Sequence, residues 1–97
     1  MLINKIANGS ELTIALDGRL DTTTAPQLEK ELGGLNDVKE LAIDMAKLSY
    51  ISSAGLRVLL KTQKVMNKQG KMTVKNVNQE IKEIFEVTGF DELLNIE

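Results

Sequence analysis

The amino-acid sequence predicts a single α/β domain built around a mixed, mostly parallel β-sheet. The chain has 97 residues and one proline, a length typical of one compact domain, which we assign to residues 1–97. Strand patterns alternate with helix patterns along most of the chain, as is typical of parallel strands joined by right-handed crossovers. A hairpin pattern at the start adds an antiparallel pair. The predicted order is β, β, α, β, α, β, α, followed by a last turn or a short edge strand at residues 90–97.

The composition narrows the classes of function. Apolar residues make up 42% of the chain and aromatic residues 3%, so the predicted core is aliphatic. The formal net charge is -2 and the basic residues are scattered, which argues against a nucleic-acid-binding surface. The chain has no cysteine and no histidine, which excludes disulfides, zinc sites of the Cys/His kind and imidazole acid–base catalysis. No membrane span or signal peptide is apparent. We therefore expect a cytoplasmic protein without direct membrane contact that is not an ordinary hydrolase.

Residues 2–17 are predicted to form a β-hairpin. Asn8-Gly9 is a strong signal for a turn between two strands. Residues 11–17 alternate apolar with small or polar side chains, as a half-buried strand does. Residues 18–21 are expected to be a connection.

A helix and a buried strand are predicted next. A threonine among residues 22–24 would serve as the N-cap, and Pro26 would stand in the first turn, where its missing N–H costs nothing. Three leucines form an apolar stripe at helical spacing, and two glycines mark the helix end; these are Leu28, Leu32 and Leu35, with Gly33 and Gly34. Residues 38–46 are a largely apolar run, which predicts a strand covered on both sides or nearly so.

The segment from residue 44 to residue 60 holds the main candidate site. Residues 48–53 are predicted to be a polar turn before a helix that starts at Ala54. A serine at this junction can cap the helix by accepting a hydrogen bond from a first-turn amide. The same place tolerates a phosphate, because free N–H groups and the positive end of the helix dipole meet there. Ser52 and Ser53 therefore have two interpretations: one is simply a cap, or one accepts a phosphoryl group from another protein.

The other candidate site residues are Gly55 and three aspartates. Glycine inside a helix costs about 1 kcal/mol relative to alanine, so Gly55 indicates close approach of the helix to a neighbouring segment, or of a partner's backbone, although helix starts also tolerate glycine. Asp17, Asp21 and Asp44 lie at or near strand ends, but the sequence shows no phosphate-binding loop that would make them part of a nucleotide site. Turn formation and solvation are the better explanation for Asp17 and Asp44. A small nucleotide-binding or phosphotransfer enzyme is the least favoured class.

Residues that mark helix ends predict the last elements of the chain. Gly70 is expected to stop the helix that starts at Ala54. Residues 71–75 alternate as a strand does. Asn78 is predicted to cap an amphipathic helix that ends at Gly89.

Two blocks of the sequence resemble the signatures of a known family. Residues 44–60, with the motif LSYISSAGLRVLL, resemble the signature of the STAS domain, the fold of bacterial anti-sigma factor antagonists. Residues 18–25, GRLDTTTA, resemble that family's second signature at a matching spacing. The resemblance covers essentially the whole chain. It implies a STAS-type fold with helices packed mainly on one face of the sheet.

The resemblance also implies a function without catalytic activity, cofactor or metal. Such antagonists bind an anti-sigma factor that is also a serine kinase, and so free the sigma factor. The kinase phosphorylates a serine two places before the motif glycine, which abolishes binding, and a serine phosphatase reverses this. That position is Ser53 here. Asp21 matches an acidic residue near this serine at the partner-binding surface, with Thr22 and Ser52 beside it; Gly55 and Leu56 are expected at the exposed start of the docking helix.

Two departures from the family motif keep alternatives open. Ser52 stands where the motif has aspartate, and Ala54 stands in the place of a second hydroxyl residue. Ser52 is therefore a second candidate acceptor. STAS domains with diverged motifs also serve as non-switching subunits of transporters, lipid-transport assemblies or stressosome-like complexes.

Overall fold

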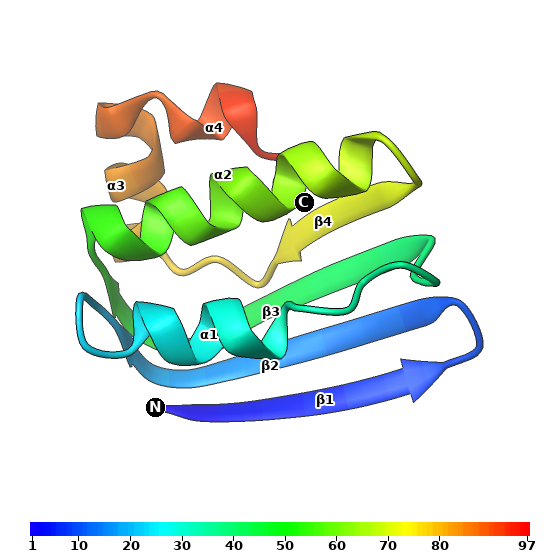
Figure 1. Cartoon of the computed structure of the whole chain (residues 1–97). Helices are drawn as coiled ribbons and strands as arrows, with labels where there is room; N and C mark the ends of the chain where they lie inside the picture. The colour runs from blue at the N-terminus through cyan, green and yellow to red at the C-terminus, as the bar shows by residue number, and fades with distance from the viewer.

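One layer of the structure is a four-stranded sheet with the strand order β1-β2-β3-β4, and the helices lie together on one face of it (Figure 1). This computed structural model describes all residues, 1–97. The strands are β1 (Leu2–Asn8), β2 (Glu11–Leu20), β3 (Glu40–Ile51) and β4 (Lys71–Lys75). The helices are α1 (Ala25–Glu31), α2 (Ser53–Asn67), α3 (Gln79–Thr88) and α4 (Phe90–Leu93). β1 is antiparallel to β2, whereas the β2–β3 and β3–β4 pairs are parallel, so the predicted α/β class with a mixed sheet is confirmed.

Two strands extend further than the sequence pattern predicts. Residues 18–20 belong to β2 and not to a connection, and residues 48–51 belong to β3 and not to a polar turn. The β2–β3 register shifts between Ala15 and Asp17 and again between Gly18 and Arg19. Such irregularities interrupt the period-two alternation of side chains, and this interruption hid the strand ends from the sequence pattern.

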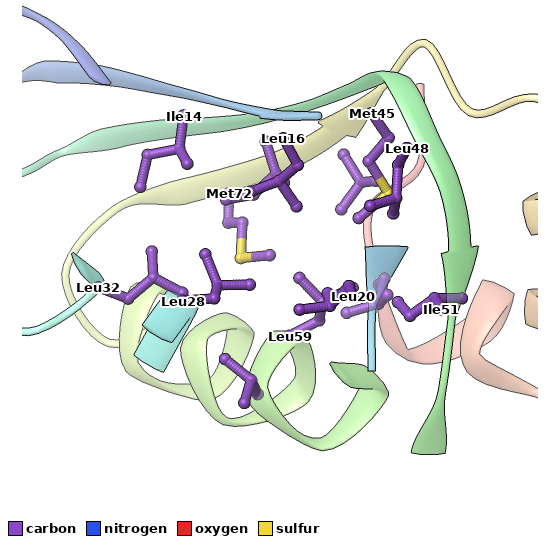
Figure 2. Close-up of a cluster of buried hydrophobic side chains, with 14 of the residues drawn as sticks. Ile14, Leu16, Leu20, Leu28, Leu32, Met45, Leu48, Ile51, Leu59 and Met72 are labelled. Atoms are coloured by element: carbon purple, nitrogen blue, oxygen red, sulfur yellow. The ribbon is translucent and has the colours of Figure 1, made fainter. Parts of the chain in front are cut away.

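The core lies between the helices and one face of the sheet, as Figure 2 shows for part of it. Alternate residues of the central strands point into it, among them Ile14 and Leu16 of β2 and Ile43 and Met45 of β3. No helix covers the opposite, open face of the sheet, and small or polar residues such as Ala42 are only half-buried there. The expectation that β3 is covered on both sides is therefore wrong.

Helix ends follow the predicted signals in part. The Asn78 side chain accepts a hydrogen bond from the Ile81 amide at 2.9 Å, and Gly89 ends α3 with φ 79°, a left-handed conformation that suits glycine. These two predictions are confirmed. Thr24 occupies the N-cap position of α1 but makes no side-chain cap bond, because its hydroxyl donates back to the Arg19 carbonyl at 2.7 Å.

The chain after α3 combines both predicted alternatives. α4 is a single turn, and Ile96 then forms a parallel bridge with Val74 on the outer edge of β4. The Val74 amide donates to the Asn95 carbonyl and the Glu97 amide donates to the Val74 carbonyl, each at 2.9 Å. Residues 95–97 therefore cover that edge of the sheet at Val74.

Candidate functional site

The parallel pairing of β2 and β3 brings the two predicted signatures together. Leu20 and Ile51 are partners at the carboxyl ends of these strands, and the Ser52 amide donates to the Leu20 carbonyl at 2.9 Å. Asp21 follows Leu20, and Ser53 follows Ser52. Both residues therefore emerge at the same edge of the sheet. We call this region the Asp21–Ser53 surface; it comprises Arg19, Asp21, Thr22, Tyr50, Ser52 and Ser53.

The two serines take different roles at the start of α2. Ser52 has an extended backbone, and its hydroxyl oxygen accepts a hydrogen bond from the Gly55 amide at 3.4 Å. Ser52 is thus the N-cap, as predicted for one of the pair. Ser53 is the first helical residue, is exposed, and its hydroxyl is free of hydrogen bonds within the chain. Its hydroxyl is the more accessible of the two.

Gly55 faces the core and not the solvent. A Cβ at this position would lie 2.6 Å from Leu20 Cγ and 3.0 Å from Ile51 Cγ1, and Figure 2 shows both of these side chains among the buried cluster beside α2. The close packing predicted for Gly55 is confirmed. Gly55 and Leu56 were expected at the exposed start of a docking helix. The expected exposure is wrong, because both residues are buried, Leu56 with 4% of its surface accessible.

Asp21 organises the loop between β2 and α1. Its Oδ1 accepts hydrogen bonds from the Thr23 hydroxyl at 2.7 Å and from the Thr23 amide at 2.9 Å, and from the Thr24 amide at 3.2 Å. These bonds, the Thr23 hydroxyl foremost, lower the pKa of Asp21 below its usual 3.8 because they favour the ionised form. Asp21 is therefore ionised at neutral pH, and it lies at the same edge of the sheet as Ser53. Thr22 is exposed next to Asp21.

An arginine and a tyrosine extend this surface, and neither was predicted. Arg19 and Tyr50 are partners across the β2–β3 pair, and the guanidinium carbon of Arg19 lies 4.3 Å from the centre of the Tyr50 ring, within the range of a cation–π contact. Arg19 Nε also lies 3.7 Å from Asp21 Oδ2. Only the strand assignment of residues 18–20 and 47–51 reveals this pairing, so the sequence pattern missed it.

Arg57 is a second unpredicted residue near the serines. It is exposed on α2 four residues after Ser53, and residues at this spacing are neighbours on a helix surface. It forms no ion pair, whereas Lys61, one turn further on, is paired with Glu29 of α1 at 2.8 Å. The helical spacing alone would have found Arg57.

The remaining carboxylates lie on the open face of the sheet. Asp44 Oδ1 accepts hydrogen bonds from the Ala46 amide and from Asn76 Nδ2, both at 3.0 Å. The Asn76 bond is the main cause of a lowered pKa for Asp44. Asp17, a partner of Leu2 on β1, points to the same open face. Neither residue belongs to the Asp21–Ser53 surface.

Comparison with known proteins identifies the family. The model of the STAS domain family matches residues 3–97. BtrV of Bordetella bronchiseptica, named as a provisional anti-sigma factor antagonist, is 38% identical over 82 residues, which cover 81% of this chain and 71% of BtrV. The anti-sigma-B factor antagonist of Bacillus subtilis is 29% identical over 91 residues, which cover 92% of this chain and 84% of that one.

A solved structure shows the shared fold. The phosphorylated form of the Bacillus cell fate determinant SpoIIAA superposes with a TM-score of 0.76 at 16% identity, over 99% of this chain and 91% of that one. None of the helices here is both long and apolar enough to cross a membrane. Anti-sigma factor antagonists are regulatory proteins and not enzymes. The protein belongs to the STAS domain family and, within it, to the anti-sigma factor antagonists.

Proposed function

We propose that this protein frees a sigma factor in the cytoplasm by binding the anti-sigma factor that holds it. The anti-sigma factor would also be a serine kinase, which switches the protein off by phosphorylating Ser53. A serine phosphatase would restore binding. Family membership supports binding of an anti-sigma factor, and the Asp21–Ser53 surface is the proposed contact.

The exposed, unbonded hydroxyl of Ser53 is the observation that carries the choice of acceptor. Ser52 is half-buried, and its hydroxyl oxygen already accepts the Gly55 amide. A phosphate on Ser52 would disturb the helix cap, with a cost to stability. A phosphate on Ser53 would instead extend into solvent from the first turn of α2, where the helix dipole favours negative charge.

Phosphorylation of Ser53 would change the charge of the surface without unfolding it. A phosphoserine carries about -1.5 to -2 charges at pH 7 and would stand at the same edge of the sheet as the ionised Asp21. Arg57, four residues on and free of an ion pair, is placed to offset part of this charge. The helix should therefore keep its structure, while a partner that docks on Asp21 and Thr22 meets a surface of altered charge. Gly55 and Leu56 would contribute to partner binding indirectly, because their packing against the core fixes the position of the two serines.

Phosphosite mapping tests this proposal. The purified chain would be incubated with lysate of its source cells, Mg²⁺ and ATP, beside Ser53→Ala and Ser52→Ala as matched variants, and analysed by mass spectrometry. We expect one phosphate on Ser53 in the unmodified chain and in Ser52→Ala, and none in Ser53→Ala. Phosphate confined to Ser52 would contradict the choice of acceptor.

The motif departures at Ser52 and Ala54 favour one competing function, a non-switching subunit of a larger assembly. This alternative predicts no phosphate on Ser53 even when an active kinase is present in the lysate. It also predicts that Ser53→Asp retains the same bound partners as the unmodified chain in affinity capture. Under the switching proposal, Ser53→Asp loses the anti-sigma factor whereas Ser53→Ala retains it.

A further inference from the structure

The sheet has two edges, and the chain covers only one of them, at a single residue. Residues 95–97 bond to Val74 on the outer edge of β4. At the other edge, β1 pairs with β2 on its inner side, and none of the 97 residues pairs with its outer side. The bare edge of a strand presents unpaired N–H and C=O groups to any other strand that can align with it.

Two large apolar side chains stand on this bare strand. Leu2 is 66% exposed and Ile6 is 65% exposed. Their partners on β2 are Asp17 and Thr13, so both side chains lie on the open face of the sheet, which no helix covers. They lie four residues apart in one strand and therefore form one row on that face.

We propose that the outer edge of β1 pairs with β1 of a second copy of this chain, antiparallel, with Leu2 opposite Ile6 and Asn4 opposite Asn4. In a continuous antiparallel sheet, directly opposed residues point to the same face. The two-fold axis must therefore lie midway between two copies of the same residue, which stand opposite each other. Centring the pair on Asn4 covers both Leu2 side chains and both Ile6 side chains. Centring it on Ile6 leaves Leu2 without a partner.

The charges on β1 favour the same alignment. Centring the pair on Lys5 would place two lysines directly opposite each other, which is destabilising. In the Asn4-centred alignment, each Lys5 lies opposite Ile3 of the other copy, on the helix side of the sheet. In the Asn4-centred alignment Lys5 can also keep its partner within its own chain, where its Nζ lies 3.5 Å from Glu31 Oε2 and donates to the Glu31 carbonyl at 3.2 Å.

The resulting dimer would hold eight strands in one sheet with both helix layers on the same side. Only five residues of each strand pair in this alignment, a contact smaller than a standard interface. The association is therefore weak, and it depends on protein concentration.

Single-cysteine cross-linking tests the alignment, since the chain contains no native cysteine. Opposed residues in an antiparallel pair have Cα atoms about 4.5–5.5 Å apart, within the roughly 4.4–6.8 Å that a disulfide spans. We expect Asn4→Cys to form an oxidised dimer about tenfold faster than Val87→Cys, an exposed α3 variant that reports random collision. Lys5→Cys should match the collision rate. Equal rates for all three would overturn the interface, and a faster rate for Lys5→Cys would overturn the alignment.

Sedimentation equilibrium tests the association without a cross-link. The unmodified chain should show an average mass that rises above 10.7 kDa as its concentration increases. Ile6→Lys, a change at an exposed position, should remain at the monomer mass over the same range, with an unchanged circular dichroism spectrum as the control for folding. A monomer mass for the unmodified chain at every concentration up to about 1 mM would refute the proposal.

Discussion

The two ends of α2 are each held by a glycine that leaves no room for a side chain, but the contacts differ in kind. At the first turn, a Cβ on Gly55 would meet side-chain atoms, 2.6 Å from Leu20 Cγ. Beyond the last turn, a Cβ on Gly70 would meet backbone atoms, 2.7 Å from the carbonyl carbon of Lys39 and 2.9 Å from its Cα. Side chains can rotate aside, whereas the Lys39 backbone is fixed because its carbonyl accepts the Lys71 amide at 2.8 Å.

This difference separates a purely structural contact from one that also serves the site. The Gly70 contact joins the end of α2 to the starts of β3 and β4, at the opposite end of the strands from the Asp21–Ser53 surface. The Gly55 contact sets the height of the first turn of α2 above the sheet, and with it the position of Ser53. Substitutions at Gly70 should therefore affect folding alone, and substitutions at Gly55 should affect both folding and the site.

The largest effect is expected for Gly70→Ala. The added methyl group cannot be accommodated unless the β3 backbone moves, so the free energy of unfolding should fall by about 3 kcal/mol or more. Urea unfolding followed by circular dichroism measures this loss. Lys68→Ala, an exposed change two residues earlier, is the control and should stay within about 0.5 kcal/mol of the unmodified chain. A similar small change in Gly70→Ala would show that this end of α2 is as adaptable as the other.

Gly55→Ala should cost less. Displacing the Leu20 side chain costs about 1–3 kcal/mol, of which the higher helix propensity of alanine returns about 1 kcal/mol. Leu20→Ala removes the clashing group, so the double variant should be more stable than the sum of the two single changes predicts. Additive losses in the same urea experiment would place the strain elsewhere.

The two serines should differ from each other by a smaller amount. Ser52→Ala removes the cap of α2 and should cost about 1 kcal/mol, while Ser53→Ala, an exposed and unbonded position, should change stability by less than about 0.5 kcal/mol. Thermal unfolding of both variants under one set of conditions provides the measurement. A greater loss in Ser53→Ala would reverse the roles assigned to the two residues.

The smallest effect concerns Asp21 and pH. The pKa of Asp21 is lowered in the folded state from 3.8, chiefly by the Thr23 hydroxyl, so its ionised form stabilises the fold at pH values above 3.8. This contribution is lost as the pH falls through the lower, folded-state pKa. Asp21→Asn keeps an acceptor oxygen but does not titrate. The difference in urea midpoint between the two chains should be constant near neutral pH and change only below about pH 4; a constant difference down to strongly acid pH would contradict this.

Local rules predicted the parts of the fold that depend on local chemistry. Asn8-Gly9 marked the hairpin, Asn78 and Gly89 marked the ends of α3, and the helical cost of Gly55 indicated close packing before any neighbour was known. The resemblance to STAS signatures pointed to Asp21 and Ser53, and the parallel register of β2 and β3 puts the strand ends that precede them side by side.

The missed features depend on register, which local rules do not supply. The shifts in the β2–β3 pairing let residues 18–20 and 47–51 continue as strands although their side chains do not alternate regularly. The Arg19–Tyr50 contact exists only because of that pairing. The burial of Leu56 likewise depends on how α2 rotates over the sheet, which Gly55 and its neighbours decide together.

The order of the sheet, in which each strand lies beside the next one in the chain, has a consequence for how the protein emerges from the ribosome. Each new strand finds its template already synthesised, so the sheet can grow one strand at a time from β1 toward β4 during translation. The cover for β4, residues 95–97, emerges after every helix and strand. A nascent chain that has completed β4 therefore exposes both edges of its sheet until those residues emerge, and each bare edge can pair with another chain during that interval.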